Sequence, residues 1–310
     1  MTQFLSVLVP IPITAAMLIS TNAPASPYPA WASGTSFAKG AFCSSATTQR
    51  VYQSLLDNNL NHDPTDLNNQ FGAIAYWQDV NPTNPWAAFD TDVSTQTTAA
   101  TSLTFTVRPG SFSDGYLAGV DADQARVLIK DAPGGTVIFD GTFQMEGSTP
   151  GEWDEWCFDP FKPLTDLPFG GIEPYSNAEA TVTLSKGAGT VKCGLLVFGT
   201  IKALGKTQYG AKAKPKSYSY IKTDDYGNTK IVRRKATTDV SMSAILSKDD
   251  ADEALATVQS VLDVPAVWFG ANLPGYAGLR VFGLGSGELT YDSYNRCTLS
   301  IDVQGVIRTT

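Results

Sequence analysis

The sequence predicts a mainly β protein built from several domains. Its 310 residues exceed the length of one ordinary sandwich. Hydrophobic residues make up 43% and charged residues 17%, a balance typical of a folded chain. The 27 glycines and 18 prolines are typical of many short strands joined by turns. We expect an extended arm over 1–25, a small β domain over 26–85, a β-sandwich over 86–200 and an α+β domain over 201–310.

The arm is apolar and lacks regular periodicity. The run "FLSVLVPIPITAAMLIS" followed by "NAPAS" has the outward form of a secretory signal. However, no Lys or Arg precedes it, and Pro10 and Pro12 interrupt the helix that a signal would form. We therefore expect an arm that is buried against a neighbouring subunit. No run of 18 apolar residues occurs anywhere, so no membrane span is predicted.

The small β domain is rich in aromatic residues among short segments punctuated by Gly, Asn and Pro. These residues are Trp31, Phe37, Phe42, Tyr52, Tyr76 and Trp77. Aromatic rings of this kind form either a core or a platform for sugar rings. We expect the first four to be mostly core, and Trp77 is the best candidate for an exposed stacking face. Of the two interpretations we favour the core.

The segment 86–200 alternates apolar and polar residues with the period of a strand. The alternating pairs are Phe105 and Val107, Val127 and Ile129, and Val182 and Leu184. Between "RVLIK" and "TVIFDG" the sequence "DAPGG" predicts a hairpin, because glycine supplies the positive φ of a tight turn. The pattern predicts a β-sandwich.

The last segment contains a hairpin with a turn at Asp225–Asn228 and then a helix in "SKDDADEALATVQSVLD". Ser247 is the expected N-cap, and the acidic residues after it suit the positive end of a helix. The apolar face consists of Ala251, Leu255, Val258 and Leu262, and Pro265 ends the helix. Strands follow, so the helix is expected to lie over an antiparallel sheet.

The charge is unevenly distributed. The net charge is −8, yet residues 201–235 hold ten Lys or Arg against Asp224 and Asp225, or +8, which leaves −16 for the rest. A basic segment can bind nucleic acid, but no nucleic-acid-binding motif rich in aromatics accompanies this one. We favour self-assembly, in which this segment meets an acidic face of the next copy. The expected contact residues are Lys212, Lys214, Lys216, Arg233 and Arg234.

No catalytic, cofactor or metal site is predicted, and the chain is not expected to be an enzyme. The cysteines, expected to be buried free thiols, are Cys43, Cys157, Cys193 and Cys297, and no pair has metal-ligand spacing. The single histidine, His62, lies in a polar, turn-like stretch. Acidic residues cluster in "GEWDEW" (151–156), but a glycosidase needs two separated carboxylates and no second cluster accompanies them.

The chain resembles a family of bacteriophage tail proteins along nearly its whole length. The resemblance rests on "FLSVLVPIPITAAMLIST", "YPAWASGTSFAKGAFC" with "RVYQSL", "NPTNPWAAFDTDVSTQT", "TLSKGAGTVKCGLLVFG", "LGKTQYGAKAKPKSYSYIKTDDYGNTKIVRR" and "CTLSIDVQGVI". Residues 28–77 are similar to a chitin-type carbohydrate-binding module, although Phe37 stands where Tyr is usual and Phe42 and Cys43 replace a polar turn. The sugar-binding residues that this similarity implies are Trp77, Tyr76, Trp31 and Tyr52.

The middle segment, through "AAFDTDVSTQT", resembles a galactose-binding-like jelly roll, and the last segment resembles the tube-forming domain of distal tail proteins. The resemblance implies a structural virion protein of the tail tip or baseplate, assembled in the host bacterial cytoplasm. Its partners would be further copies in a ring, other tail proteins and, in the alternative role of a receptor-binding protein, a host surface glycan. A secreted glycan-binding or hydrolytic enzyme is the third class of protein considered. The sequence shows neither the catalytic pair nor the signal peptide that such a protein would need.

Overall fold

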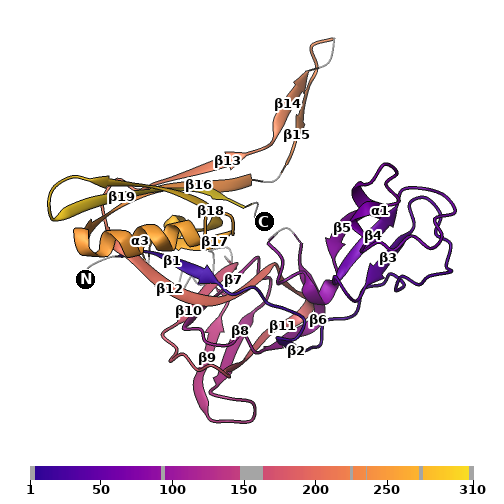
Figure 1. Ribbon diagram of the computed structural model, residues 1–310, viewed down its shortest axis with the longest axis horizontal. Coiled ribbons are helices and arrows are strands. Elements are labelled where there is room, and N and C mark those ends of the chain that lie inside the picture. Colours follow the sequence, from indigo (N-terminus) through magenta and orange to yellow (C-terminus); the bar gives the residue numbers. More distant parts are fainter. Residues whose placement is uncertain are drawn as a thin grey trace, which may run out of the picture.

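The computed structural model describes residues 4–91, 95–146, 163–223, 226–234, 236–271 and 275–306. Strands dominate it, which confirms the mainly β prediction. Figure 1 shows a sandwich-like body, a small lobe to one side and a hairpin that projects upward from the ends of β13 and β16.

The small lobe is an antiparallel sheet of order β3-β4-β5 with a short helix beside it. Its core is formed by Phe37, Cys43, Tyr52 and Trp77, with Trp31 and Tyr76 partly buried around it. The elements are β3 (Phe42–Ser45), β4 (Arg50–Ser54), α1 (Leu67–Phe71), β5 (Trp77–Pro82) and the 3₁₀ turn η1 (Asn84–Trp86).

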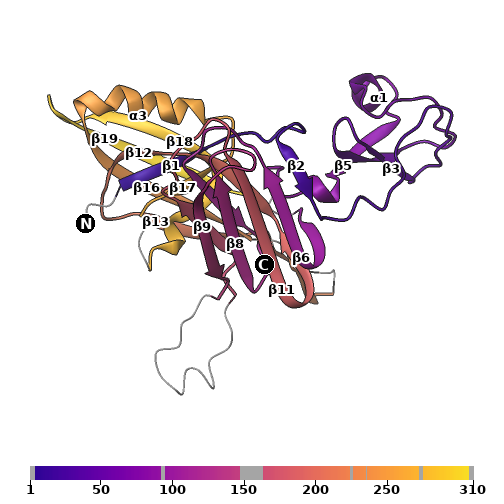
Figure 2. The same cartoon turned by 90° about the horizontal axis from the view of Figure 1, so that it is seen from below.

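A five-stranded sheet of order β2-β6-β11-β8-β9 forms one layer of the body, and four of its strands lie side by side in Figure 2. The period-two prediction is confirmed: Phe105, Val127 and Val182 are fully buried. The 131–136 hairpin is also confirmed, since the Asp131 N–H donates to the Thr136 carbonyl at 3.1 Å. The strands are β2 (Leu18–Thr21), β6 (Thr97–Val107), β8 (Gln124–Lys130), β9 (Val137–Gln144) and β11 (Glu179–Cys193).

The other layer is a nine-stranded sheet of order β10-β7-β12-β1-β17-β18-β19-β16-β13. The end of β12 also pairs with β16, so the strands from β12 to β16 form a closed circuit. The strands are β1 (Phe4–Pro10), β7 (Asp114–Ala118), β10 (Asp166–Gly170), β12 (Leu195–Thr207), β13 (Lys212–Ser217), β16 (Ala236–Ser247), β17 (Ala266–Phe269), β18 (Arg280–Tyr291) and β19 (Arg296–Gly305); η2 (Ala277–Leu279) precedes β18.

The two layers share a core that crosses the expected domain boundary. Phe169 of β10 and Phe198 of β12 pack in the same cluster as the five-stranded sheet, with their ring centroids 6.1 Å apart. The boundary expected between residues 200 and 201 falls inside β12, which continues into the C-terminal half of the sheet. The sandwich and the α+β segment are therefore joined by one continuous sheet.

The predicted helix is confirmed as α3 (Lys248–Ser260), and Ser247 is its N-cap, accepting the Asp250 N–H at 3.3 Å. Ala251 and Val258 are buried against the nine-stranded sheet as expected. The expectation for Leu262 was wrong: it is 44% exposed, because the helix ends before it.

The expectation that the N-terminal arm is buried against a neighbouring subunit was wrong. Its first part is β1, an inner strand that pairs with β12 on one side and β17 on the other. Leu5, Val7 and Leu8 are fully buried within their own chain. Its second part, β2, joins the five-stranded sheet beside β6. The apolar residues that suggested an intermolecular contact are the core of this fold.

Candidate assembly surface

Strand β13 is an edge of the nine-stranded sheet, and all six of its residues are exposed. It pairs with β16 on one side, which leaves the backbone groups of its other side available to solvent or to a partner. Lys and Pro at an edge discourage indiscriminate strand addition, and Pro215 removes one N–H donor. A partner at this edge is therefore expected to bind chiefly through side chains.

The three lysines of β13 lie on one face of the strand, because successive side chains alternate. Lys212, Lys214 and Lys216 stand opposite Ser241, Asp239 and Thr237 of β16 in the register of the sheet. All three are exposed, as are Arg233 and Arg234. Within the described chain, none of these five cations forms an ion pair. Their charge is thus free to act on another molecule.

The base of the projecting hairpin is held by polar contacts. The Ser219 hydroxyl accepts the Arg234 N–H at 2.8 Å and donates to the Arg234 carbonyl at 3.2 Å. The Arg234 guanidinium lies 5.0 Å from the centroid of the Tyr220 ring, and the Lys216 ammonium lies 5.4 Å from that of Tyr218. These cation–π contacts fix where the hairpin leaves the sheet.

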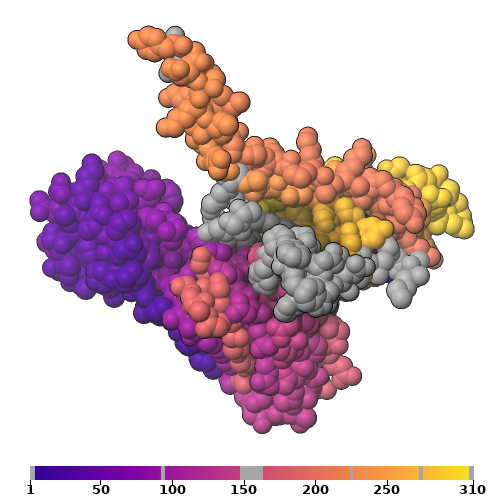
Figure 3. All heavy atoms as spheres, turned by 180° about the vertical axis from the view of Figure 1, so that it is seen from behind, coloured from indigo at the N-terminus to yellow at the C-terminus, as the bar shows by residue number. Residues whose placement is uncertain are grey.

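The hairpin itself consists of β14 (Tyr220–Thr223) and β15 (Thr229–Val232), the strands expected on either side of the 225–228 turn. It forms a separate two-stranded sheet and projects from the body in Figures 1 and 3. Ile221 and Ile231 face each other across it and are 67% and 65% exposed. Lys222 and Lys230 are also directly opposite, a like-charge pair that destabilises a hairpin.

An isolated two-stranded hairpin is at best marginally stable in water. This one adds an exposed isoleucine pair and a repulsive lysine pair, and Tyr226 near its tip is 92% exposed. A contiguous exposed apolar patch commonly marks an interaction site. The composition of the hairpin therefore fits a segment that is covered when the protein assembles.

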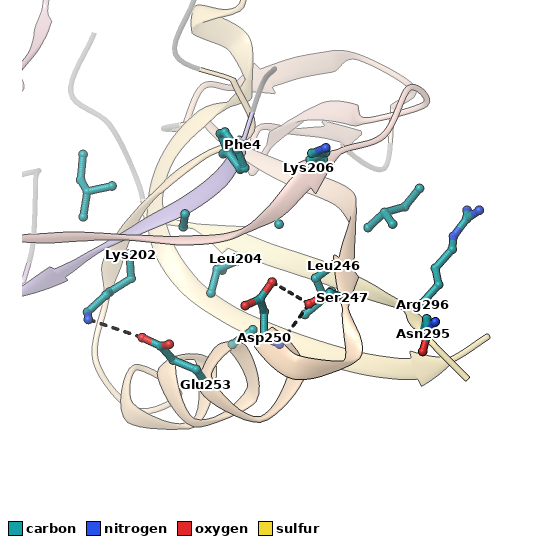
Figure 4. A pocket seen from close by; sticks show the side chains of 15 residues that line it. Phe4, Lys202, Leu204, Lys206, Leu246, Ser247, Asp250, Glu253, Asn295 and Arg296 are labelled. Carbon is teal, nitrogen blue, oxygen red and sulfur yellow. Dashed lines mark hydrogen bonds and ion pairs between the residues drawn. The ribbon is translucent and has the colours of Figure 1, made fainter. Parts of the chain in front are cut away.

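A groove of about 750 Å³ lies between β12 and α3, and Figure 4 shows its lining. Both of its carboxylates have polar partners in the groove: Lys202 lies 3.7 Å from Glu253, and the carboxylate of Asp250 accepts the Ser247 hydroxyl at 2.8 Å. Phe4 of β1 adds an apolar wall. Neither histidine nor cysteine is among the described residues that line the groove.

The expected sugar-stacking role of Trp77 was wrong, because this side chain is 1% exposed. Its indole N–H donates to the His62 carbonyl at 2.7 Å, and its ring meets Phe37 edge-on with centroids 5.2 Å apart. Tyr52 is also in the core, where burial raises its pKa. A buried ring has no face for a sugar, so neither residue can serve as a platform.

Trp31 and Tyr76 remain partly exposed, and Tyr76 stacks on His62 with ring centroids 3.4 Å apart. The structure adds a stacked pair that sequence reasoning missed, Tyr28 and Phe42, with centroids 5.0 Å apart. No local signal could have paired them, because Tyr28 lies outside any regular element.

The described cysteines, Cys43, Cys193 and Cys297, are free and buried as predicted. Burial raises the pKa of the Cys43 thiol to about 12, with the nearby Asp63 carboxylate contributing, and burial raises that of Cys193 to about 12. Such thiols stay protonated and unreactive. Within the part of the chain that the structure describes, no three His, Cys, Asp or Glu residues converge as a metal site requires. Cys157 and the acidic cluster at 151–156 lie outside that part.

Comparison with protein-family models, curated proteins and solved structures gave no match. Among the described helices, none combines the length and apolarity needed to cross a bilayer.

Proposed function

We propose that this protein is a structural subunit that assembles with copies of itself, in a ring at the tip or baseplate of a bacteriophage tail. The observation that carries the proposal is the projecting β14–β15 hairpin beside the basic edge strand β13. Together they present an exposed isoleucine pair, a like-charged lysine pair and five cations that form no ion pair within the described chain. The assignment to a phage tail rests on the resemblance of the sequence.

Charge supports an assembly role over a nucleic-acid role. The chain carries −8 overall while its basic residues gather on β13 and the hairpin. Copies can therefore attract one another when the basic surface of one meets an acidic surface of the next. Edge strands and two-stranded hairpins are elements that assembly commonly completes.

The test is the mass of the wild type in solution, measured by light scattering over a range of protein and salt concentrations. We expect oligomers that weaken as salt rises, since exposed ionic contacts are screened. Replacing Lys212, Lys214 and Lys216 together by Glu should weaken assembly further. The control reverses Lys39, Lys130 and Lys192, which changes the net charge equally on other parts of the surface. Equal assembly by both triple variants would count against the proposal.

The tail location has its own test. Antibody to this chain, coupled to gold and viewed on virions by electron microscopy, should label the tail tip. Labelling elsewhere on the particle, or none on intact and dissociated virions that contain the chain, would contradict that location.

Glycan binding is the second candidate, and the aromatic surface of the small lobe favours it. A cavity of about 550 Å³ at the base of the lobe includes the stacked Tyr28 and Phe42 and the side chains of Asn81 and Gln96. None of its lining residues is charged. Rings that stack on a sugar and amides that bond its hydroxyls would suit a neutral glycan.

The glycan candidate is tested on an array and by titration of any hit. Tyr28→Ala and Tyr76→Ala should each weaken a bound glycan roughly three- to tenfold if the mutated ring stacks on it. No binding by the wild type on arrays and on host cells would reject this candidate.

A further inference from the structure

We infer that the β14–β15 hairpin of one copy docks head-to-tail in an acidic groove on a second copy. We define the acidic groove by the residues that line it: Asp239, Val240, Ser241, Leu262, Asp263, Leu284, Gly285, Ser286, Asp302, Val303 and Gln304. The inference rests on the proposed self-assembly and names the contact that produces it.

The hairpin side of the contact is cationic and apolar. Ile221 and Ile231 form one exposed pair, and Lys222 and Lys230 form the adjacent pair. Adjacent residues of a strand point to opposite faces, so one face carries the isoleucines and the other carries the lysines. An acceptor must supply apolar surface for the first pair and negative charge for the second.

The acidic groove supplies both. It has a volume of about 580 Å³ and gathers three carboxylates, Asp239, Asp263 and Asp302, with no Lys or Arg in its lining. Leu262 and Leu284 contribute the apolar part and are 44% and 43% exposed. In the described chain none of the three carboxylates is in an ion pair.

The other two cavities do not match the hairpin. The groove between β12 and α3 is lined by three cations, Lys202, Lys206 and Arg296, and by two carboxylates, Asp250 and Glu253. Its lining is therefore net positive and would repel the lysine pair. The cavity at the base of the small lobe has no charged lining residue. Of the three cavities compared, the acidic groove alone has the complementary charge.

The hairpin is not seated in the groove of its own chain. Its strands pair only with each other among the described strands, and the space-filling view shows it standing clear of the body (Figure 3). Lys214 stands opposite Asp239 in the β13–β16 register, and no ion pair joins them. Asp263 and Asp302 are therefore the better residues for testing the contact.

Because the hairpin and the groove are different surfaces, the contact is heterologous. In a row of such contacts the copy at one end keeps a free hairpin and the copy at the other end keeps a free groove, so the row either closes into a ring or extends as an open filament. The proposed ring is one outcome of this geometry.

The test uses two variants that are each defective on one side of the contact. The hairpin variant is Lys222→Glu with Lys230→Glu, and the groove variant is Asp263→Lys with Asp302→Lys. Each alone juxtaposes like charges and should weaken self-association about a hundredfold or more. An equimolar mixture offers two complementary contacts, the unaltered hairpin with the unaltered groove and the reversed hairpin with the reversed groove. It should therefore regain assembly in which the two variants alternate, whereas neither variant should assemble alone.

A chain that carries all four substitutions should regain assembly, since the charges are then swapped on both sides. Circular dichroism and thermal unfolding establish that each variant is folded, and Lys222→Gln with Lys230→Gln serves as a milder hairpin variant. Wild-type assembly by the folded groove variant, or a mixture that stays monomeric, overturns the inference. If the β13 lysine variant loses assembly while the groove variant still assembles, the result supports the proposed self-assembly but rejects the contact between hairpin and groove. A wild type that is monomeric at every concentration overturns both.

Discussion

Replacing Trp77 by Ala should strongly destabilise the small lobe while leaving the stability of the rest of the chain unchanged. Trp77 is buried, packs edge-on against Phe37 and donates its indole N–H to the His62 carbonyl. Truncating a buried aromatic side chain to Ala costs about 3–5 kcal/mol. We use about 4 kcal/mol, the middle of this range. We add nothing for the lost ring contact and hydrogen bond, because the range already includes such losses. A lobe of this size has a stability near the low end of roughly 5–15 kcal/mol, so most of it would be lost.

Hydrogen exchange followed by mass spectrometry measures this loss strand by strand. Since 1.4 kcal/mol is a factor of ten, amides of β3, β4 and β5 should exchange about a thousandfold faster in the variant. Amides of β18 and β19 should be unchanged. Trp31→Ala is the matched control, because truncating this half-buried ring should lower the free energy of unfolding by only about 1–2 kcal/mol. Protection of the lobe in Trp77→Ala within tenfold of the wild type would refute the reasoning.

Three further predictions concern the body of the protein. Deleting residues 4–10 removes an inner strand, so the truncated chain should lose cooperative thermal unfolding; a truncated chain with an unchanged melting temperature would show that β1 is dispensable. Ser247→Ala removes the N-cap of α3 and should lower the free energy of unfolding in urea by about 1 kcal/mol, whereas Ser260→Ala near the end of the helix should cost less. Cys43 and Cys193 have pKa values of about 12, so on the order of one thiol in ten thousand is ionised at pH 8, and iodoacetamide should label them only in denaturant; peptide mapping that finds either labelled in the folded protein would contradict their burial.

Local signals predicted the local features of the fold. The N-cap at Ser247 and the glycine turn of the 131–136 hairpin are encoded by residues within a few positions of one another. The order of strands in the nine-stranded sheet is not encoded locally, because β1 pairs with β12 and β17, which lie about 200 and about 260 residues away. The apolar composition of β1 indicated burial, but it could not indicate which surface would cover it.

The error over Trp77 has a similarly simple cause. Tyr76 and Trp77 are adjacent at the start of β5, and successive side chains of a strand point to opposite faces. The sequence therefore indicates that one ring is in the core and the other is outside, but the choice depends on the register with β4, where Trp77 stands opposite Ser54. For the assembly surface, the clustering of cations was visible in the sequence. The isolation of the hairpin and the presence of the acidic groove can be recognised only in the structure.

The position of β1 has a consequence for the order of events during synthesis. The ribosome makes this strand well before its neighbours, β12 and β17, which emerge only after residues 207 and 269 have been added. Until then the strand has no partner, and its apolar side chains Leu5, Val7 and Leu8 are exposed to solvent and to other molecules. The small lobe, whose three strands are close together in the chain, can fold early. The nine-stranded sheet can close only after β19 has been added, so the nascent chain is an expected client of chaperones that bind apolar segments.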